Sequence, residues 1–225
     1  MSNTTKYVFG YGTGRCGTES LAHLLNRQHG VTAYHEQMPL HWLPTTGYHN
    51  AVGWLKGIDN YVVGAVGYYW MKYIPFLLKD FYPVKFIHIW REKEEVVESF
   101  WNRKQNTIQN TTPSDEWFGM YPFLGYPPTK DRIAETWDKY HYIARKLEAL
   151  LNPKMFLKMH MKDLNDLGNV EDLLNFVEAP EHGRVIERVH INKGPVEDLL
   201  PGLRRLSEMN KPMKRSPEDL SAQAV

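Results

Sequence analysis

The sequence predicts a single α/β domain built on a parallel sheet of about four to five strands with helices on its faces. Two observations carry this prediction. Five short apolar runs of strand length are separated by stretches in which apolar residues recur at helical spacing. A glycine-rich loop joins the first apolar run to the first helical stretch, an arrangement that is typical of anion-binding βα units.

The elements follow one another in regular alternation. The apolar runs predict strands at Tyr7–Gly10, Val31–His35, Tyr61–Val66, Val84–Trp90 and Met155–His160. Helical stripes lie at Leu21, Leu24 and Leu25, at Val96, Val97 and Phe100, and, as the longest, from Ile133 to Leu151. The segment Thr107–Lys130 is rich in Pro and Gly, and we expect a long loop that serves as a lid or an acceptor-site wall.

Bulk properties limit the classes of function. The 225 residues suit one domain over 1–225, in which 209–225 form a frayed polar tail. The net charge of +1 gives no general attraction to nucleic acid or anionic membranes, so an anion site must come from local arrangement. One cysteine excludes an internal disulfide, and no run is apolar enough to span a membrane. We therefore expect a cytoplasmic protein that has no transmembrane segment and binds no nucleic acid.

The glycine-rich loop is the most informative local pattern. Gly12 and Gly17 have the Gly-x-x-x-x-Gly spacing of a phosphate-binding loop. The next residue is Thr18, where a nucleoside triphosphatase needs Lys, and the cation stands inside the loop at Arg15. The loop therefore suits a phosphate-like group but not an ordinary kinase or ATPase.

The same loop allows a second interpretation. Gly12, Gly14 and Gly17 also satisfy Gly-x-Gly-x-x-Gly, and Glu36 stands 19 residues after Gly17 at the end of the second predicted strand. A dinucleotide-binding fold places its ribose-binding acid there. An NAD(P)-dependent oxidoreductase that uses these glycines and Glu36 is therefore an alternative, and a merely structural glycine turn is another.

A second candidate anion site follows the fourth strand. Arg91 ends that strand, and Ser99 and Arg103 lie on the helix that follows, one turn apart. An arginine and a hydroxyl placed in this way can hold a phosphate through charge-assisted hydrogen bonds. The alternative is a surface arginine that pairs with Glu94 or Glu95. Arg15, Glu36 and Arg91 each follow a strand, so we expect them to face one crevice.

Two of these motifs together resemble the sulfotransferase family: Gly-Thr-Gly-Arg-Cys-Gly-Thr at 12–18, and Lys85-Phe-Ile-His-Ile-Trp-Arg91 with Ser99 eight residues further on. The resemblance implies a P-loop-NTPase-like fold. It also implies 3′-phosphoadenosine 5′-phosphosulfate (PAPS) as donor and the 3′,5′-bisphosphate PAP as product. The 5′-phosphosulfate would lie on Gly12, Thr13, Gly14, Arg15, Cys16, Gly17, Thr18, Glu19 and Ser20. The 3′-phosphate would lie on Arg91 and Ser99, helped by Arg103, Lys193 and Gly194.

The chemistry that the resemblance implies is sulfuryl transfer to a hydroxyl group. Glu36 is the expected base, with His35 as the second choice, and Arg15 stabilises the leaving phosphate. This loop cation is Lys in many family members, and Lys93 stands where the family often has Pro. Two further alternatives are a small-molecule kinase with a variant loop and a non-catalytic nucleotide-binding module.

The aromatic residues, the histidines and the single cysteine each suggest a role. The aromatic residues between Trp42 and Tyr126 are expected partly to pack the core and partly to line a pocket for a small hydroxylated acceptor such as a sugar, lipid, alcohol or phenol. No histidine pair has a tight metal-ligand spacing, and we expect no metal. The helix N-terminus favours the Cys16 thiolate, but without an identifiable base partner we interpret Cys16 as a small loop residue. Tyr142 and Lys146 are expected on a helix surface.

Overall fold

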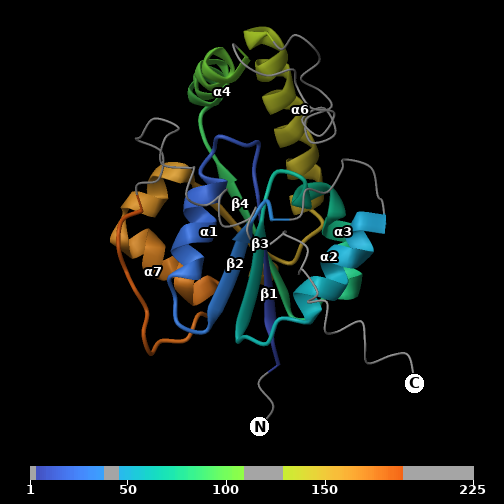
Figure 1. Ribbon diagram of the computed structural model, residues 1–225, viewed down its shortest axis with the longest axis vertical. Coiled ribbons are helices and arrows are strands. Elements are labelled where there is room, and N and C mark those ends of the chain that lie inside the picture. Colours follow the sequence, from blue (N-terminus) through green and yellow to red (C-terminus); the bar gives the residue numbers. More distant parts are fainter. Residues whose placement is uncertain (1–3, 38–45, 109–128, 190–225) are drawn as a thin grey trace, which may run out of the picture. The chain divides into compact units, whose positions relative to one another are not determined.

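The computed structural model describes residues 4–37, 46–108 and 129–189 (Figure 1). Its strands are β1 (Lys6–Tyr11), β2 (Val31–His35), β3 (Val62–Val66), β4 (Val84–Trp90) and β5 (Phe156–His160). Its α-helices are α1 (Thr18–Asn26), α2 (Thr46–Lys56), α3 (Trp70–Asp80), α4 (Lys93–Ile108), α6 (Lys130–Glu148) and α7 (Leu167–Phe176). Two short 3₁₀ turns, η1 (Pro153–Met155) and η2 (Met161–Asn165), flank β5.

The five described strands form one parallel sheet in the order β2-β3-β1-β4-β5. Phe9 in the middle of β1 pairs with Ala65 of β3 on one side and with Phe86 of β4 on the other. Because all strands run the same way, their carboxyl ends lie along one edge of the sheet. The predicted fold class, an α/β domain on a parallel sheet of this size, is confirmed.

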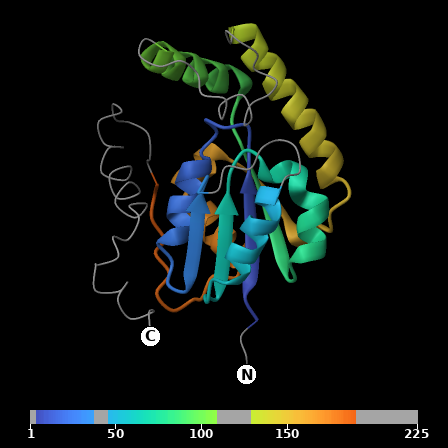
Figure 2. The same cartoon turned by 45° about the vertical axis from the view of Figure 1, so that its right-hand side comes forward.

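The sheet is covered on both faces. Helices α1 and α7 lie on one face, and α2, α3 and α6 lie on the other, which the turned view also shows (Figures 1 and 2). The strands bury apolar residues on both sides, as expected for a parallel sheet between helices. Leu21, Leu24 and Leu25 of α1 are buried, as their spacing predicts.

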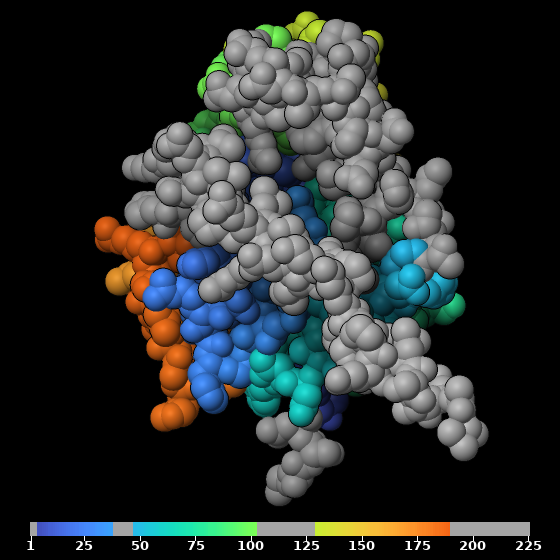
Figure 3. All heavy atoms as spheres, viewed as in Figure 1, coloured from blue at the N-terminus to red at the C-terminus, as the bar shows by residue number. Residues whose placement is uncertain are grey.

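The chain that follows α7 packs against α1. Gln28, just after α1, donates its side-chain N–H to the carbonyl of Val185 at 3.0 Å and accepts the backbone N–H of Val185 at 2.8 Å. Arg27 pairs with Glu187 at 2.5 Å. Figure 3 shows this segment in orange beside the blue surface of α1. These contacts lie at the edge of the sheet opposite the strand ends that carry Arg15 and Arg91.

Three helices were not individually predicted from apolar spacing: α2, α3 and α7. Helix α3 contains Pro75 and a dense aromatic run, so its local pattern is poor for a helix. Both ends of the loop expected over Thr107–Lys130 are helical, since α4 reaches Ile108 and α6 begins at Lys130. Residues 109–128 lie outside the described ranges, as do Lys193, Gly194 and the expected tail at 209–225. The single domain over 1–225 therefore stays a prediction.

Candidate functional site

The loop from Gly12 to Gly17 joins β1 to α1 at the carboxyl end of the sheet. Three of its residues have positive φ angles: Gly14 at 77°, Arg15 at 54° and Gly17 at 97°. Backbones in such a conformation turn successive N–H groups toward one point and form a concave anion-binding surface. Gly17 caps α1 without a side-chain hydrogen bond, so the N–H groups of the first helical turn also point toward this surface.

Close packing explains why two glycines of the loop must be glycines. A Cβ atom on Gly12 would lie 2.3 Å from Sγ of Cys16 and 2.4 Å from the carbonyl oxygen of Ile89. A Cβ atom on Gly17 would lie 2.6 Å from Cγ of Met161, in a backbone conformation that side chains rarely adopt. The loop therefore lies directly on the ends of the neighbouring elements and admits no side chain at either position.

Cys16 is buried beneath this loop. Burial raises the pKa of its thiol to about 11, although a hydrogen bond with Thr13 and nearby backbone groups lower it. The expectation that the helix N-terminus favours the thiolate is therefore wrong, because desolvation outweighs the helix terminus. The interpretation of Cys16 as a small packing residue agrees with its complete burial.

The remaining loop residues are placed by α1. Thr13 is buried and donates its hydroxyl to the carbonyl of Gly14 at 3.2 Å. Thr18 and Ser20 are buried in the first turn of α1, and Glu19 is half-buried between them. These side chains hold the loop in shape, while its backbone offers the N–H groups.

Arg15, Arg91 and Ser99 meet beside the loop. Arg15 donates Nε–H to Oγ of Ser99 at 3.2 Å, and Arg91 donates from Nη1 to the carbonyl oxygen of Arg15 at 3.4 Å. The two arginines come from motifs 76 residues apart in the sequence. Two permanently positive side chains and a hydroxyl in the same region have the composition of an anion site. Arg15, which the resemblance assigned to the other phosphate, here contacts the hydroxyl expected to bind the 3′-phosphate.

A carboxylate lies against the same cluster. Oε2 of Glu95 accepts from Nε of Arg91 at 2.7 Å, and Oε1 accepts from Nζ of Lys162 at 2.9 Å. The hydrogen bonds with Arg91 and then Lys162 lower the pKa of Glu95 to about 2. The alternative in which Arg91 pairs with Glu95 is therefore correct as a contact, and Arg91 also reaches the loop. The sequence did not predict Lys162 as part of this cluster. It reaches Glu95 because the turn η2, which follows β5, lies beside Arg91 and Glu95.

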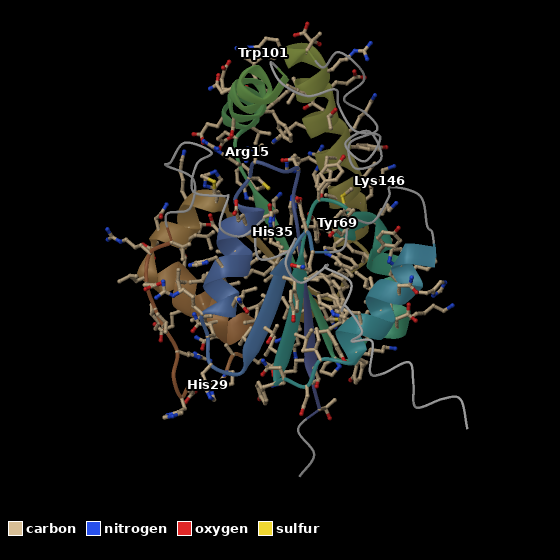
Figure 4. The ribbon with its side chains drawn as sticks, viewed as in Figure 1. Arg15, His29, His35, Tyr69, Trp101 and Lys146 are labelled. Carbon is tan, nitrogen blue, oxygen red and sulfur yellow. The ribbon has the colours of Figure 1, made fainter. Side chains whose placement is uncertain are left out.

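His35 and Glu36 follow β2 at the same edge of the sheet. Nε2 of His35 lies 3.1 Å from Oγ1 of Thr18 and 4.0 Å from Oε1 of Glu36. Glu36 has a φ of 47° and donates its backbone N–H to the carbonyl of Val66 at 3.0 Å. In Figure 4, Arg15, His35 and Tyr69 follow one another across the carboxyl ends of the strands, with His29 at the opposite end. The predicted crevice residues therefore lie at one edge.

Glu36 borders a small hollow whose walls include four aromatic side chains. Its lining residues are Tyr34, Glu36, Gln37, Ala51, Trp54, Leu55, Ala65, Tyr69 and Trp70. Tyr69 and Trp70 are almost fully buried here, whereas Tyr34 and Trp54 are half-buried and pack against each other with ring centroids 4.4 Å apart. Tyr68 and Tyr73, by contrast, belong to the buried core. Tyr68 and Tyr73 are therefore core residues, and a role of the hollow in holding an acceptor stays a prediction.

Strand order bears on the dinucleotide alternative. In a dinucleotide-binding fold, the strand that carries the acid pairs directly with the strand that precedes the glycines. Here β3 lies between β1 and β2, which places the end of β2 about 10 Å, or two strand spacings, from the end of β1. This arrangement argues against a shared role of Gly12, Gly14, Gly17 and Glu36 in binding one dinucleotide.

The other predicted residues are less informative. Arg103 lies in α4, but its side chain is outside the described part of the chain. Tyr142 and Lys146 lie on α6, with Tyr142 exposed and the Lys146 ammonium group over its ring, as expected for a helix surface. Over the described ranges, no three His, Cys, Asp or Glu side chains gather so as to hold a metal ion. In the same ranges, no helix combines the length and apolarity needed to cross a membrane.

Comparison with known proteins identifies the fold. No family model and no curated protein sequence matches this chain. Among solved structures, the sulfotransferase domain from the curacin biosynthetic pathway is similar over 87% of this chain and 82% of that one, with a TM-score of 0.52 and 16% identity. A sulfotransferase from Alicyclobacillus acidocaldarius is similar over 90% of this chain and 91% of that one, with a TM-score of 0.58 and 12% identity.

A third structure, mouse sulfotransferase SULT7A1 complexed with PAP, covers 96% of this chain at 15% identity, but its TM-score of 0.42 is too low to indicate a common fold. The first two likenesses extend over most of both chains. The class is therefore an α/β protein with a glycine-rich loop after β1. Within that class, the chain has the fold of the sulfotransferases, as the resemblance of its motifs predicted.

Proposed function

We propose that this protein transfers a sulfuryl group from PAPS to a hydroxyl group of a small-molecule acceptor. One observation carries the proposal: Arg15 of the loop, Arg91 and Ser99 meet in a single cluster beside a backbone built to bind anions. The donor has two anionic groups, a 5′-phosphosulfate and a 3′-phosphate, and so needs two adjacent anion sites. The sulfotransferase fold supports the same assignment.

The glycine-rich loop and the cluster of Arg91 and Ser99 bind different groups of the donor. The backbone N–H groups of Gly14–Ser20 face the 5′-phosphosulfate, and Arg91 and Ser99 face the 3′-phosphate. Arg15 lies next to Ser99 and can neutralise charge on either group, since a guanidinium presents several N–H donors in one plane. Arg103, Lys193 and Gly194 are proposed to complete the 3′-phosphate site, as the resemblance implies.

The transfer step needs little covalent chemistry from the protein. The acceptor oxygen forms a bond to sulfur while the bond from sulfur to the phosphate oxygen breaks, and PAP leaves with the electron pair of that bond. Glu36 takes the proton of the acceptor hydroxyl, and Arg15 stabilises the charge that develops on the leaving phosphate. His35, which contacts both Thr18 and Glu36, is the second choice as base. The aromatic hollow beside Glu36 is proposed as part of the acceptor site.

The proposal is tested by calorimetric titration with PAP, with NAD and ATP–Mg²⁺ as parallel ligands. We expect PAP to bind, and we expect Arg91→Ala to weaken it by about 10- to 100-fold, since a hydrogen bond to a charged group contributes roughly 1.5–3 kcal/mol. Arg27→Ala is the matched control, because Arg27 pairs with Glu187 at the other end of α1. Binding of NAD or ATP–Mg²⁺ in place of PAP would contradict the proposal.

A further inference from the structure

A buried polar pair lies behind the proposed donor site, and the transfer mechanism does not use it. His88, in the middle of β4, is completely buried, and Glu148 ends α6 with little of its side chain exposed. Nδ1 of His88 lies 2.5 Å from Oε1 of Glu148, although off the line of a well-directed hydrogen bond. One of these two atoms must carry a proton, because two lone pairs at that distance would repel each other.

The same carboxylate also binds the end of β1. Tyr11, the residue directly before Gly12, donates its hydroxyl to Oε1 of Glu148 at 3.2 Å. The Tyr11 ring stacks on the His88 imidazole with centroids 5.0 Å apart and an angle of 15° between the planes. Glu148 therefore connects α6 to two neighbouring strands, one leading into the glycine loop and the other into Arg91.

A second line of contacts connects α6 to the end of β4. The His141 ring packs against His88 at 5.1 Å and against Trp137 at 3.9 Å. Trp137 donates its indole N–H to the carbonyl oxygen of Arg91 at 3.1 Å. Burial, assisted by the charges of His88, Lys158 and Arg145, lowers the pKa of His141 to about 3, so His141 is neutral. Contact is thus continuous from Glu148 to Arg91.

The buried carboxylate of Glu148 depends on its partners. Burial raises the pKa of Glu148, but His88, Lys158 and the Tyr11 hydroxyl lower it by more, so the carboxylate stays ionised in a largely buried place. A buried carboxylate that loses a partner is left with uncompensated charge, and the surrounding structure must rearrange to solvate it. Any such rearrangement here would displace the ends of β1 and β4.

We propose that His88 and Glu148 are positioning residues, which fix α6 against β1 and β4 and thereby set the distance between the glycine loop and Arg91. The part of this inference that concerns donor affinity rests on the proposed function. A ligand held at both ends by groups on different strands binds tightly only when those groups are held at a fixed separation. Neither His88 nor Glu148 touches the donor.

The first experiment needs no ligand. Hydrogen exchange is compared among the wild type, His88→Gln, Glu148→Gln and the double variant. The matched control is Glu178→Gln, because Glu178 pairs with Lys6 of β1 and Lys85 of β4, each at 2.6 Å, near the opposite ends of the same strands. We expect the single variants to speed exchange at 12–20 and 89–95, and the control to leave those segments unchanged. If exchange there stays as in the wild type, or rises equally in the control, the inference is wrong.

The second experiment measures PAP affinity and, once an acceptor is known, its KM. We expect each single variant to raise the Kd for PAP by about tenfold and the neutral pair of the double variant to recover part of that loss. The acceptor KM should not change. Equal losses in donor and acceptor binding would show a general structural role and overturn the inference.

A milder variant is available at Tyr11, and the exchange result can be judged apart from PAP binding. If His88→Gln does not fold, Tyr11→Phe removes only the hydroxyl that binds Glu148, and it should raise exchange at 12–20 to a smaller extent; unchanged exchange would count against the inference. If the exchange result is as expected but the wild type binds no PAP, the coupling of α6 to the loop stands and the proposed function fails.

Discussion

The Nε atom of Arg91 lies 2.7 Å from Oε2 of Glu95, one helical turn further along the chain. The carboxylate therefore competes with any anion for one edge of the guanidinium group. We expect Glu95→Gln to strengthen PAP binding by about 3- to 10-fold at low salt, because it removes a negative charge next to the phosphate site. Calorimetry at several salt concentrations measures this effect, which should shrink as salt rises. Weaker binding by Glu95→Gln would show instead that Glu95 positions Arg91.

The same ion pair gives a pH dependence with a definite sign. Arg91 and Lys162 lower the pKa of Glu95 from 4.5 to about 2 in the folded protein, so its contribution to stability is present above pH 4.5 and is lost as the pH falls toward 2. The stability difference between the wild type and Glu95→Gln should therefore be constant near neutral pH and shrink below pH 4.5. Thermal unfolding at a series of pH values checks this, and a difference that grows in acid would contradict it.

Glu36 and His35 can be separated by substitution. We expect Glu36→Gln to lower kcat by about 10²- to 10⁴-fold, the usual contribution of a general base, and to leave PAP affinity unchanged because Glu36 is proposed to act on the acceptor and not on the donor. His35→Gln should lower kcat less. The measurement uses radiolabelled donor with a panel of small alcohols and phenols, and calorimetry for PAP. Full turnover by Glu36→Gln together with its loss in His35→Gln would assign the base to His35.

Two glycines should respond to alanine in opposite ways. Gly17→Ala forces a side chain into a φ of 97° and against Met161, and we expect it to destabilise the protein by about 1–3 kcal/mol and to weaken PAP binding. Gly53→Ala is the control, because Gly53 lies inside α2 with nothing near its Cβ position. That substitution should stabilise by about 0.5–1 kcal/mol. Denaturant unfolding distinguishes them, and tolerance of Gly17→Ala would contradict the described loop geometry.

Cys16 should react slowly with thiol reagents in the folded protein. Burial raises its pKa from 9.0 to about 11, which leaves about a hundredfold less thiolate at pH 8 than in the unfolded chain, before blocked access is counted. Because the chain has one cysteine, alkylation reports on this position alone. Labelling rates with and without denaturant measure the difference, and similar rates in both would mean that the loop opens readily.

Much of the fold could be predicted because each buried strand is a short apolar run in the sequence. The run predicted at Val84–Trp90 is strand β4 without any change, and the run predicted at Tyr7–Gly10 is β1 short by one residue at each end. Parallel strands between two helical layers are apolar throughout, so their length and position can be read directly. The nearness of Arg15 and Arg91 also follows from sequence, since residues after parallel strands share one edge of the sheet. The contact between Arg15 and Ser99 was not predicted.

The other features of the site depend on which strands are neighbours in the sheet. Local sequence patterns do not indicate the order of the strands. The order that places β3 between β1 and β2 separates the ends of these two strands and argues against the dinucleotide alternative. Lys162 reaches Glu95 only because β5 pairs with β4. The thiol of Cys16 was misjudged for a similar reason, because its burial depends on packing against Gly12 rather than on its place in the chain.

The position of β3 has a consequence for how such a protein can change. Groups proposed to hold the donor follow β1 and β4, whereas the hollow beside Glu36 is lined by residues of β2, α2, β3 and the start of α3. Substitutions at Tyr34 or Trp54 therefore alter the walls of the hollow without touching Arg91 or Ser99. If the hollow holds the acceptor as proposed, evolution or laboratory selection can change acceptor choice at the β2 side of the sheet and leave the residues after β1 and β4 as they are.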